Sequence, residues 1–136
     1  MSQENVEVVL RMWGASMEGD PAELDLSLVA ENVVYEDDIL PDHGSETYHG
    51  HEGIRRAWAR AIEPFEAAET ENVIEWTRDA GDRVVSWHHV RGRATASAIP
   101  VDFRYAYLWR FEGGKVVYLK SFRDPKQALE AAGLRE

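Results

Sequence analysis

The chain has 136 residues, and we expect residues 1–136 to form one domain. It carries 25 acidic against 15 basic residues, and this net charge of −10 argues against a nucleic-acid partner. There is no cysteine, which excludes disulfides, thiolate metal sites and a cysteine nucleophile. The first 17 residues lack the apolar core of a secretory signal, and no stretch approaches the roughly 20 apolar residues of a membrane span. We therefore expect a cytoplasmic protein that does not bind membranes.

The first half of the sequence predicts three helices and one strand. Apolar residues recur at helical spacing in the first and the third of these helices, and an Asp-Pro pair starts the second one. One short run alternates between apolar and polar residues as a strand does. The helices are expected over Glu4–Glu18, from Asp20 to about Val29 and over Gly53–Phe65, and the strand over Val33–Asp37. The polar, turn-rich residues 38–50 are expected to form a loop beside any site.

The second half predicts an antiparallel meander and a short final helix. Turn residues at 79–82 and 112–115 separate strand-like runs, and Asp124-Pro125 opens a last helix that Gly133 closes. The runs cover Glu71–Arg78, Arg83–Ala96, Val101–Glu112 and Lys115–Arg123. Helices that are separated from a meander are typical of the α+β class.

One strand of the meander has an aromatic row along a single face. The row consists of Phe103, Tyr105, Tyr107, Trp109 and Phe111. So large an apolar face needs a cover, and the helical stripes that contain Trp13 and Trp58 would provide it. We therefore expect Trp58 and Trp109 to be buried on the same side of the sheet. Aromatic rings build cores, and they also line small-molecule pockets.

An ordered set of short segments runs through nearly the whole chain. They are Gly19-Asp20, Val33–Asp37, His49–Ile54, Trp109–Val117 and Asp124–Leu134. Together they resemble the SnoaL-like branch of the NTF2-like superfamily, to which the ketosteroid isomerases are related. The resemblance implies a cone in which N-terminal helices cover the concave face of a curved antiparallel sheet around an apolar pocket. It does not choose an activity, because this fold hosts isomerases, cyclases, hydrolases and proteins with no known chemistry.

Asp37 is the general base that the resemblance implies. Ketosteroid isomerases have a catalytic aspartate at this position, where a carboxylate can move a proton next to a carbonyl. The alternative is a solvated acidic loop, since Glu36 and Asp38 flank it. Tyr107 falls where those enzymes have a protonated aspartate and could donate to an oxyanion. Met12 replaces their tyrosine and cannot donate, which argues against steroid isomerisation.

Ser121 argues against two other chemistries of the superfamily. Limonene-epoxide-type hydrolases carry a Tyr-x-Asn that is similar to Tyr35-Glu36-Asp37, an arginine near His88 and a carboxylate on the last strand. Ser121 stands at the position of that carboxylate, so their water-activating arrangement cannot form. SnoaL-type polyketide cyclases also rely on an acid there, and the same objection applies to them.

One of two adjacent histidines must face the pocket. Alternation puts His88 on the face of Val84 and Ser86 and puts His89 on the other face, and the register favours an inward His88. An inward His88 could be an acid–base partner or a core histidine bonded to a tyrosine hydroxyl. The five histidines lack metal-binding spacing and no nucleotide-binding motif occurs, so we expect neither a metal nor another cofactor.

Two hypotheses follow. In the first, the protein is a cofactor-independent isomerase or lyase that acts on a small, largely apolar organic molecule, with Asp37 as base, Tyr107 as donor and His88 as auxiliary acid or orienting group. The ligand-binding residues would be Trp13, Tyr35, Trp58, Tyr105, Trp109 and Ser121, and residues 38–50 could add His43 or Tyr48. In the second, a non-catalytic module binds a small ligand in the same pocket.

The opposite face of the aromatic strand is the expected dimer interface. This face presents Arg104, Ala106, Leu108 and Arg110. In the SnoaL-like proteins that this chain resembles, the convex face commonly packs against a second subunit. The apolar residues Ala106 and Leu108 favour a homodimer over a solvated face.

Overall fold

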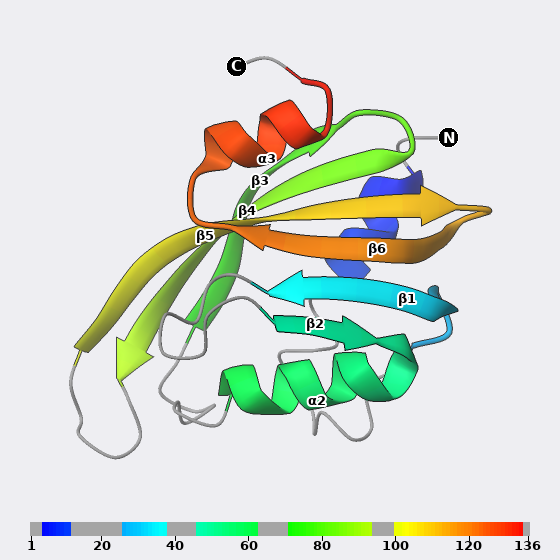
Figure 1. Cartoon of the computed structure of the whole chain (residues 1–136). Coiled ribbons are helices and arrows are strands. Elements are labelled where there is room, and N and C mark those ends of the chain that lie inside the picture. The colour runs from blue at the N-terminus through cyan, green and yellow to red at the C-terminus, as the bar shows by residue number, and fades with distance from the viewer. Residues whose placement is uncertain (1–3, 12–25, 38–45, 63–70, 94–99, 135–136) are drawn as a thin grey trace.

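A six-stranded sheet forms the centre of the protein, in the order β2-β1-β6-β5-β4-β3 (Figure 1). The computed structural model describes residues 4–11, 26–37, 46–62, 71–93 and 100–134. The strands are β1 Val29–Asp37, β2 Glu46–His49, β3 Glu71–Asp79, β4 Arg83–Arg93, β5 Pro100–Glu112 and β6 Lys115–Phe122. The helices are α2 Gly50–Ile62 and α3 Pro125–Ala131, and residues 4–11 are also helical. The predicted α+β class is confirmed.

The predicted meander and both of its turns are confirmed. Strands β3 to β6 pair antiparallel in sequence order. The turn between β5 and β6 uses Gly113 and Gly114, whose φ angles of 58° and 80° fit a two-residue hairpin of the primed type. In the turn before β4, the backbone N–H of Gly81 donates to the side chain of Asp79 at 2.8 Å.

The sheet is mixed, which differs from the wholly antiparallel sheet that was expected. β1 pairs antiparallel with β2 on one side and parallel with β6 on the other. The parallel pair joins strands far apart in the chain, which no hairpin connects. Alternation along a strand shows which side chains share a face but carries no information on strand direction, so the sequence pattern could not reveal this pairing.

Two expectations for the first half were wrong. Ser27 and Leu28 form a turn and Val29 starts β1, so the helix predicted from Asp20 cannot extend to Val29. The predicted loop 38–50 contains β2, which pairs with β1 and leads directly into α2 through Gly50 at a φ of 72°. β2 has only four residues and two of them are exposed, so its alternation was too short to recognise. Residues 12–18 of the predicted first helix, with Trp13, lie outside the described residues.

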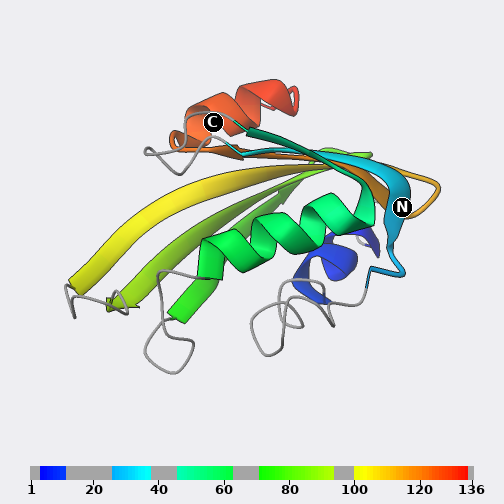
Figure 2. The ribbon, with the colours of Figure 1, turned by 60° about the horizontal axis from the view of Figure 1, so that its bottom comes forward.

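The sheet is curved, and helices lie on both of its faces. Figure 2 shows α2 and the helical residues 4–11 inside the curve and α3 on the convex face. The concave core buries Trp58 of α2 together with Trp109 of β5, which confirms that the two indoles share one side of the sheet. The rest of the aromatic row belongs to this core, with Phe103 partly buried. Ile54 and Ala57 complete the described buried stripe of α2.

The convex face has its own apolar cover within the same chain, which was not expected. Ala106 and Leu108 of β5 are buried in a second core with Ala128 and Leu129 of α3. The side chain of Asp124 caps α3 by accepting from the N–H of Lys126 at 2.9 Å. Ala106 and Leu108 were the reason to expect a dimer on this face, and α3 already covers them. The dimer itself stays a prediction.

None of the helices in the described part of the chain has the length and apolar character needed to cross a membrane.

Candidate functional site

The strand registers place four polar side chains in one row across the concave face. Ser86 of β4 is opposite Tyr107 of β5, which is opposite Ser121 of β6. The parallel register of β1 with β6 then brings Asp37 beside Ser121, and the hydroxyl of Ser121 donates to Asp37 Oδ1 at 3.1 Å. Asp37 is only 9% exposed. It is therefore a buried, hydrogen-bonded carboxylate at the end of β1 rather than part of a solvated acidic loop.

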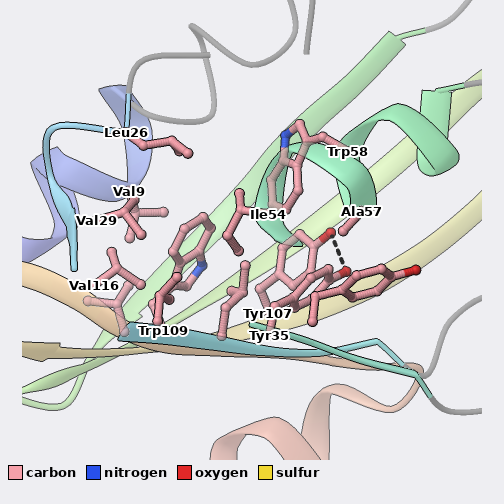
Figure 3. Close-up of a cluster of buried hydrophobic side chains, with 14 of the residues drawn as sticks. Val9, Leu26, Val29, Tyr35, Ile54, Ala57, Trp58, Tyr107, Trp109 and Val116 are labelled. Carbon is pink, nitrogen blue, oxygen red and sulfur yellow. Dashed lines mark hydrogen bonds between the residues drawn. The ribbon is translucent and has the colours of Figure 1, made fainter. Parts of the chain in front are cut away.

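Two tyrosine hydroxyls meet within the concave core. The phenol oxygens of Tyr35 and Tyr107 lie 3.3 Å apart in a hydrogen bond (Figure 3). The indole of Trp58 stacks on Tyr107 at 6.3 Å and meets Tyr35 edge to face at 5.7 Å between ring centroids. α2 thus supplies a third ring to the pair from the sheet, and all three side chains are buried.

Both phenols remain protonated over the whole physiological pH range. Burial raises the pKa of Tyr35 well above its usual value, and the nearby Asp37 carboxylate raises it further. Burial also raises the pKa of Tyr107, with additional contributions from Tyr35 and Asp37. A protonated phenol can donate a hydrogen bond to an oxyanion, so the chemical requirement for the role expected of Tyr107 is met.

Two further tyrosines extend the aromatic cluster. Tyr105 lies beside Tyr107 along β5, with ring centroids 5.0 Å apart. Tyr48 of β2 stacks on Tyr35 at 5.8 Å and is buried. Of the two residues that the predicted loop could have supplied, Tyr48 therefore joins the cluster, whereas His43 lies outside the described residues.

His88 faces inward, as the register predicted, and is completely buried. Its Nε2 is hydrogen-bonded to Ser86 Oγ at 2.7 Å, and Trp109 Nε1 donates to the same oxygen at 2.8 Å. The imidazole stacks on Tyr105 with centroids 4.8 Å apart and meets the edge of Tyr107 at 5.1 Å. Burial lowers the pKa of His88 to about 3, so the ring is neutral at physiological pH.

Ser86 is the residue of this group that the sequence did not single out. It lies on the same face of β4 as the two buried valines Val84 and Val90, and it is itself completely buried. A hydroxyl on an otherwise apolar inner face needs a partner, because an unpaired buried polar group is costly. A serine among apolar residues on an inner strand face therefore predicts that a polar group lies next to it, but the sequence does not identify that group.

His89 faces outward into a cluster of charged side chains on the convex face. Its Nε2 lies 2.6 Å from Asp102 Oδ1, and its Nδ1 lies 3.9 Å from Glu75 Oε2. Arg104 Nε donates to Glu75 Oε1 at 2.8 Å, so residues of β3, β4 and β5 are linked across the sheet. Adjacent histidines therefore lie on opposite faces in unlike surroundings.

The concave face thus brings most of the expected site residues into one cluster. Asp37, Tyr35, Tyr107 and Ser121 form its polar part, and His88 joins it through its ring contacts. Among the residues that the structure describes, no group of three or more His, Asp or Glu is placed to hold a metal ion. The apolar pocket and the chemical roles of these residues stay predictions, and Trp13 lies outside the described residues.

The comparisons with known proteins point to one family and leave the activity open. The SnoaL-like domain family matches residues 9–119. No curated protein matches the chain by sequence.

Several solved structures have the same fold. A putative SnoaL-like polyketide cyclase from a Jannaschia species superposes with a TM-score of 0.76 at 21% identity, covering 96% of this chain and 92% of that one. A hypothetical protein with a ketosteroid isomerase-like fold from Catenulispora acidiphila, solved with trimethylamine, has a TM-score of 0.70 at 24% identity, covering 93% and 92%. An NTF2-like protein of unknown function from Burkholderia pseudomallei has a TM-score of 0.72 at 22% identity, covering 93% and 95%. At these identities the likeness shows the fold alone.

Proposed function

The protein belongs to the SnoaL-like domain family, and on this basis we propose that it is a cofactor-independent isomerase or lyase. Its substrate is a small, largely apolar organic molecule with a carbonyl group, which binds at the concave face beside Asp37. The buried Asp37 carboxylate, held by Ser121 next to a pair of protonated phenols, is the observation that carries the proposal.

In the proposed reaction Asp37 removes a proton from the carbon next to the carbonyl. The electron pair of the C–H bond moves toward the carbonyl oxygen, where the hydroxyl of Tyr107 donates a hydrogen bond. In an isomerase the proton then returns to another carbon. In a lyase the electron pair forms a carbon–carbon double bond as the leaving group departs, and the leaving group takes the proton from Asp37. Ser121 donates to one carboxylate oxygen, Oδ1, and so fixes the orientation of the Asp37 carboxylate that acts as the base.

His88 acts in this proposal as an orienting group. Its pKa of about 3 means that it carries no proton to give as an imidazolium near neutral pH. Of the two roles considered for it, the low pKa favours the orienting role. Its flat contact with Tyr105 and its edge contact with Tyr107 support that role.

The test is a comparison of two neighbouring carboxylates. Asp37→Asn keeps the size of the side chain and removes the base, and we expect it to lower the rate by roughly 100- to 10,000-fold. Glu36→Gln is the control, because Glu36 lies on the other face of β1 and accepts a hydrogen bond from Tyr118 at 2.8 Å. The assay is deuterium exchange into small ketones, followed by proton NMR. An Asp37→Asn protein that exchanges as fast as the wild type would show that the assigned base is wrong.

A binding module without catalysis is the second candidate. The hydroxyls of Tyr35 and Tyr107 are hydrogen-bonded to each other, and a packed aromatic cluster with one carboxylate suits an organic cation as well as a ketone. The Catenulispora acidiphila relative was solved with trimethylamine, so small amines belong in the ligand screen. If no ketone is turned over, and apolar ligands still bind Asp37→Asn while amines bind it more weakly than the wild type, the binding module is the better account.

A homodimer through the convex face is the partner that we propose. Beyond α3 this face carries the half-buried, stacked indoles of Trp76 and Trp87, and beside them the charges of Glu75 and Arg104. Both signs of charge on one patch suit a two-fold interface, in which each patch meets its own copy. Sedimentation should give a dimer at micromolar concentration, and a monomer there would contradict the proposal.

A further inference from the structure

Ser86 lies at the centre of a buried hydrogen-bonded chain behind the proposed site. Trp109 Nε1 can only donate, and it donates to Ser86 Oγ at 2.8 Å. The same oxygen lies 2.7 Å from His88 Nε2. All three side chains are completely buried, so water does not compete for these bonds.

The direction of the second bond follows from counting protons. Ser86 has one hydroxyl proton, and in the described part of the chain its hydroxyl has two hydrogen-bond partners, Trp109 and His88. If His88 donated from Nε2, Ser86 would accept twice and its own proton would be buried without an acceptor. Leaving a buried donor unsatisfied costs about 1–3 kcal/mol. His88 Nδ1 makes no hydrogen bond with any described residue in either arrangement, so the reverse direction leaves two buried groups unsatisfied, Nδ1 and the Ser86 proton, and the relay leaves only the first. The lower-energy arrangement is therefore a relay in which Trp109 donates to Ser86 and Ser86 donates to His88 Nε2.

We propose that Ser86 is a positioning residue, which fixes His88 as the tautomer protonated on Nδ1. By holding the imidazole in one orientation, Ser86 also fixes the positions of the Tyr105 and Tyr107 rings that contact it. The chain has the same direction throughout, so each bond polarises and strengthens the next. This inference rests on the proposed function for its catalytic consequence, whereas the tautomer and the ring positions are properties of the protein alone.

The contacts of the imidazole explain how a hydroxyl on β4 acts on phenols of β5. The His88 ring is nearly coplanar with Tyr105, at an angle of 7°, and nearly perpendicular to Tyr107, at 81°. Rotation of the imidazole about its last torsion would break both contacts. The bond to Ser86 prevents that rotation, so the hydroxyl of Tyr107 stays within hydrogen-bonding distance of the Tyr35 hydroxyl, 3.3 Å away. The lowered pKa of His88 agrees with a ring that accepts at Nε2 and remains neutral.

The first experiment uses the wild-type protein without any substrate. Two-bond proton–nitrogen NMR spectra of uniformly ¹⁵N-labelled protein distinguish protonated from unprotonated imidazole nitrogens, and the spectrum of His88→Gln identifies the signals of His88. We expect Nδ1 protonated and Nε2 unprotonated, with no change between pH 8 and pH 5. A proton on Nε2, or an average of both tautomers, would overturn the proposal.

Variants then test the positioning role. Ser86→Thr keeps the hydroxyl and should keep both the tautomer and the ring resonances of Tyr105 and Tyr107. Ser86→Ala should give a mixture of tautomers and shifted, broadened ring resonances. Ser121→Ala is the comparison, because it removes a hydroxyl from the same row and should leave the His88 tautomer unchanged. Unaltered tyrosine signals in Ser86→Ala would refute the positioning role, and if that variant does not fold, the wild-type and Ser86→Thr spectra still decide the tautomer.

The catalytic consequence has its own readout. In the ketone exchange assay Ser86→Ala should lower kcat about tenfold with KM nearly unchanged, and Ser86→Thr should restore it. A tenfold loss corresponds to about 1.4 kcal/mol, close to one ordinary hydrogen bond. If no ketone reacts with the wild type, the proposed function fails and the NMR result on Ser86 stands by itself. If the wild type reacts and Ser86→Ala retains its kcat, the catalytic part of this inference is wrong.

Discussion

His88 and His89 are consecutive residues of β4 whose environments differ in almost every physical respect. His88 is completely buried among aromatic rings, bonded to a neutral hydroxyl, and has a pKa of about 3. His89 faces the convex side, where its ring is bonded to the carboxylate of Asp102 and lies near Glu75. The comparison shows that strand alternation, rather than residue type, decides whether a histidine is a neutral part of a core or a member of a charged surface cluster.

The same contrast extends to the two faces of the sheet. The concave face joins buried polar groups through hydrogen bonds, with aromatic rings packed around them. The convex face carries ion pairs between partly exposed side chains, next to the apolar residues that α3 covers. Because the concave face is buried, losing one of its hydrogen bonds costs much stability, whereas solvent and salt weaken the ion pairs of the convex face. Three predictions test this difference.

The largest effect is expected from Trp109. Trp109→Ala should lower the free energy of unfolding by about 3–5 kcal/mol, because it leaves a cavity in the concave core and removes the donor to Ser86. Trp87→Ala is the control on the convex face, where the indole is only half-buried, and it should lose clearly less. Denaturant unfolding at pH 7 measures both. Equal losses would mean that the two faces do not differ as proposed.

The second effect is a pH dependence that His88 confers on stability. The folded protein has a pKa of about 3 at His88 against 6.5 for a free histidine, so between about pH 3 and pH 6.5 only the unfolded state binds this proton. Stability from this residue is therefore complete above pH 6.5 and falls by about 1.4 kcal/mol for each pH unit from there down to about pH 3.

His88→Gln should remove this slope between pH 6.5 and pH 4, even though the substitution also destabilises the core. His89→Gln should keep it, because His88 is intact in that variant. The measurement is the free energy of unfolding against pH for the three proteins. Parallel curves for wild type and His88→Gln would show that His88 takes up its proton in the folded state.

The smallest effect is expected on the convex face. The bond to His89 holds the pKa of the Asp102 carboxyl below its usual value, so its contribution to stability is present above the normal carboxyl pKa and is lost as the pH falls through the lowered one. Asp102→Asn should lower the melting temperature only slightly at pH 7 and low salt, and high salt should remove the difference. A large loss that persists in high salt would place this pair in a far more buried setting than 66% exposure of the Asp102 side chain allows.

Several parts of the site could be predicted from the sequence because they depend on alternation alone. The period of two along β5 put Tyr105, Tyr107 and Trp109 on one face, and the same period on β4 put His88 with them. The side of Asp37 followed in the same way from Tyr35 on β1. These are local properties of a strand, and the helical stripe of α2 with Trp58 is another.

Other features could not be predicted because they depend on which strands are neighbours. The bond between Ser121 and Asp37 exists because β1 and β6 lie side by side and parallel, 84 positions apart in the chain. The bond between Tyr35 and Tyr107 requires two strands that are separated in the sheet by β6. Ser86 was missed for the same reason, since one of its partners, Trp109, lies on another strand.

The sequence by itself determined the α+β class, the meander with its two turns, and the inward faces of β1, β4 and β5, because periodicity and turn residues act over a few positions. Only the tertiary structure decided the mixed sheet, the short strand β2, the convex position of α3 and the neutral state of His88. Each of these depends on pairing, packing or burial between segments far apart in the chain, and a local pattern carries no information about such contacts.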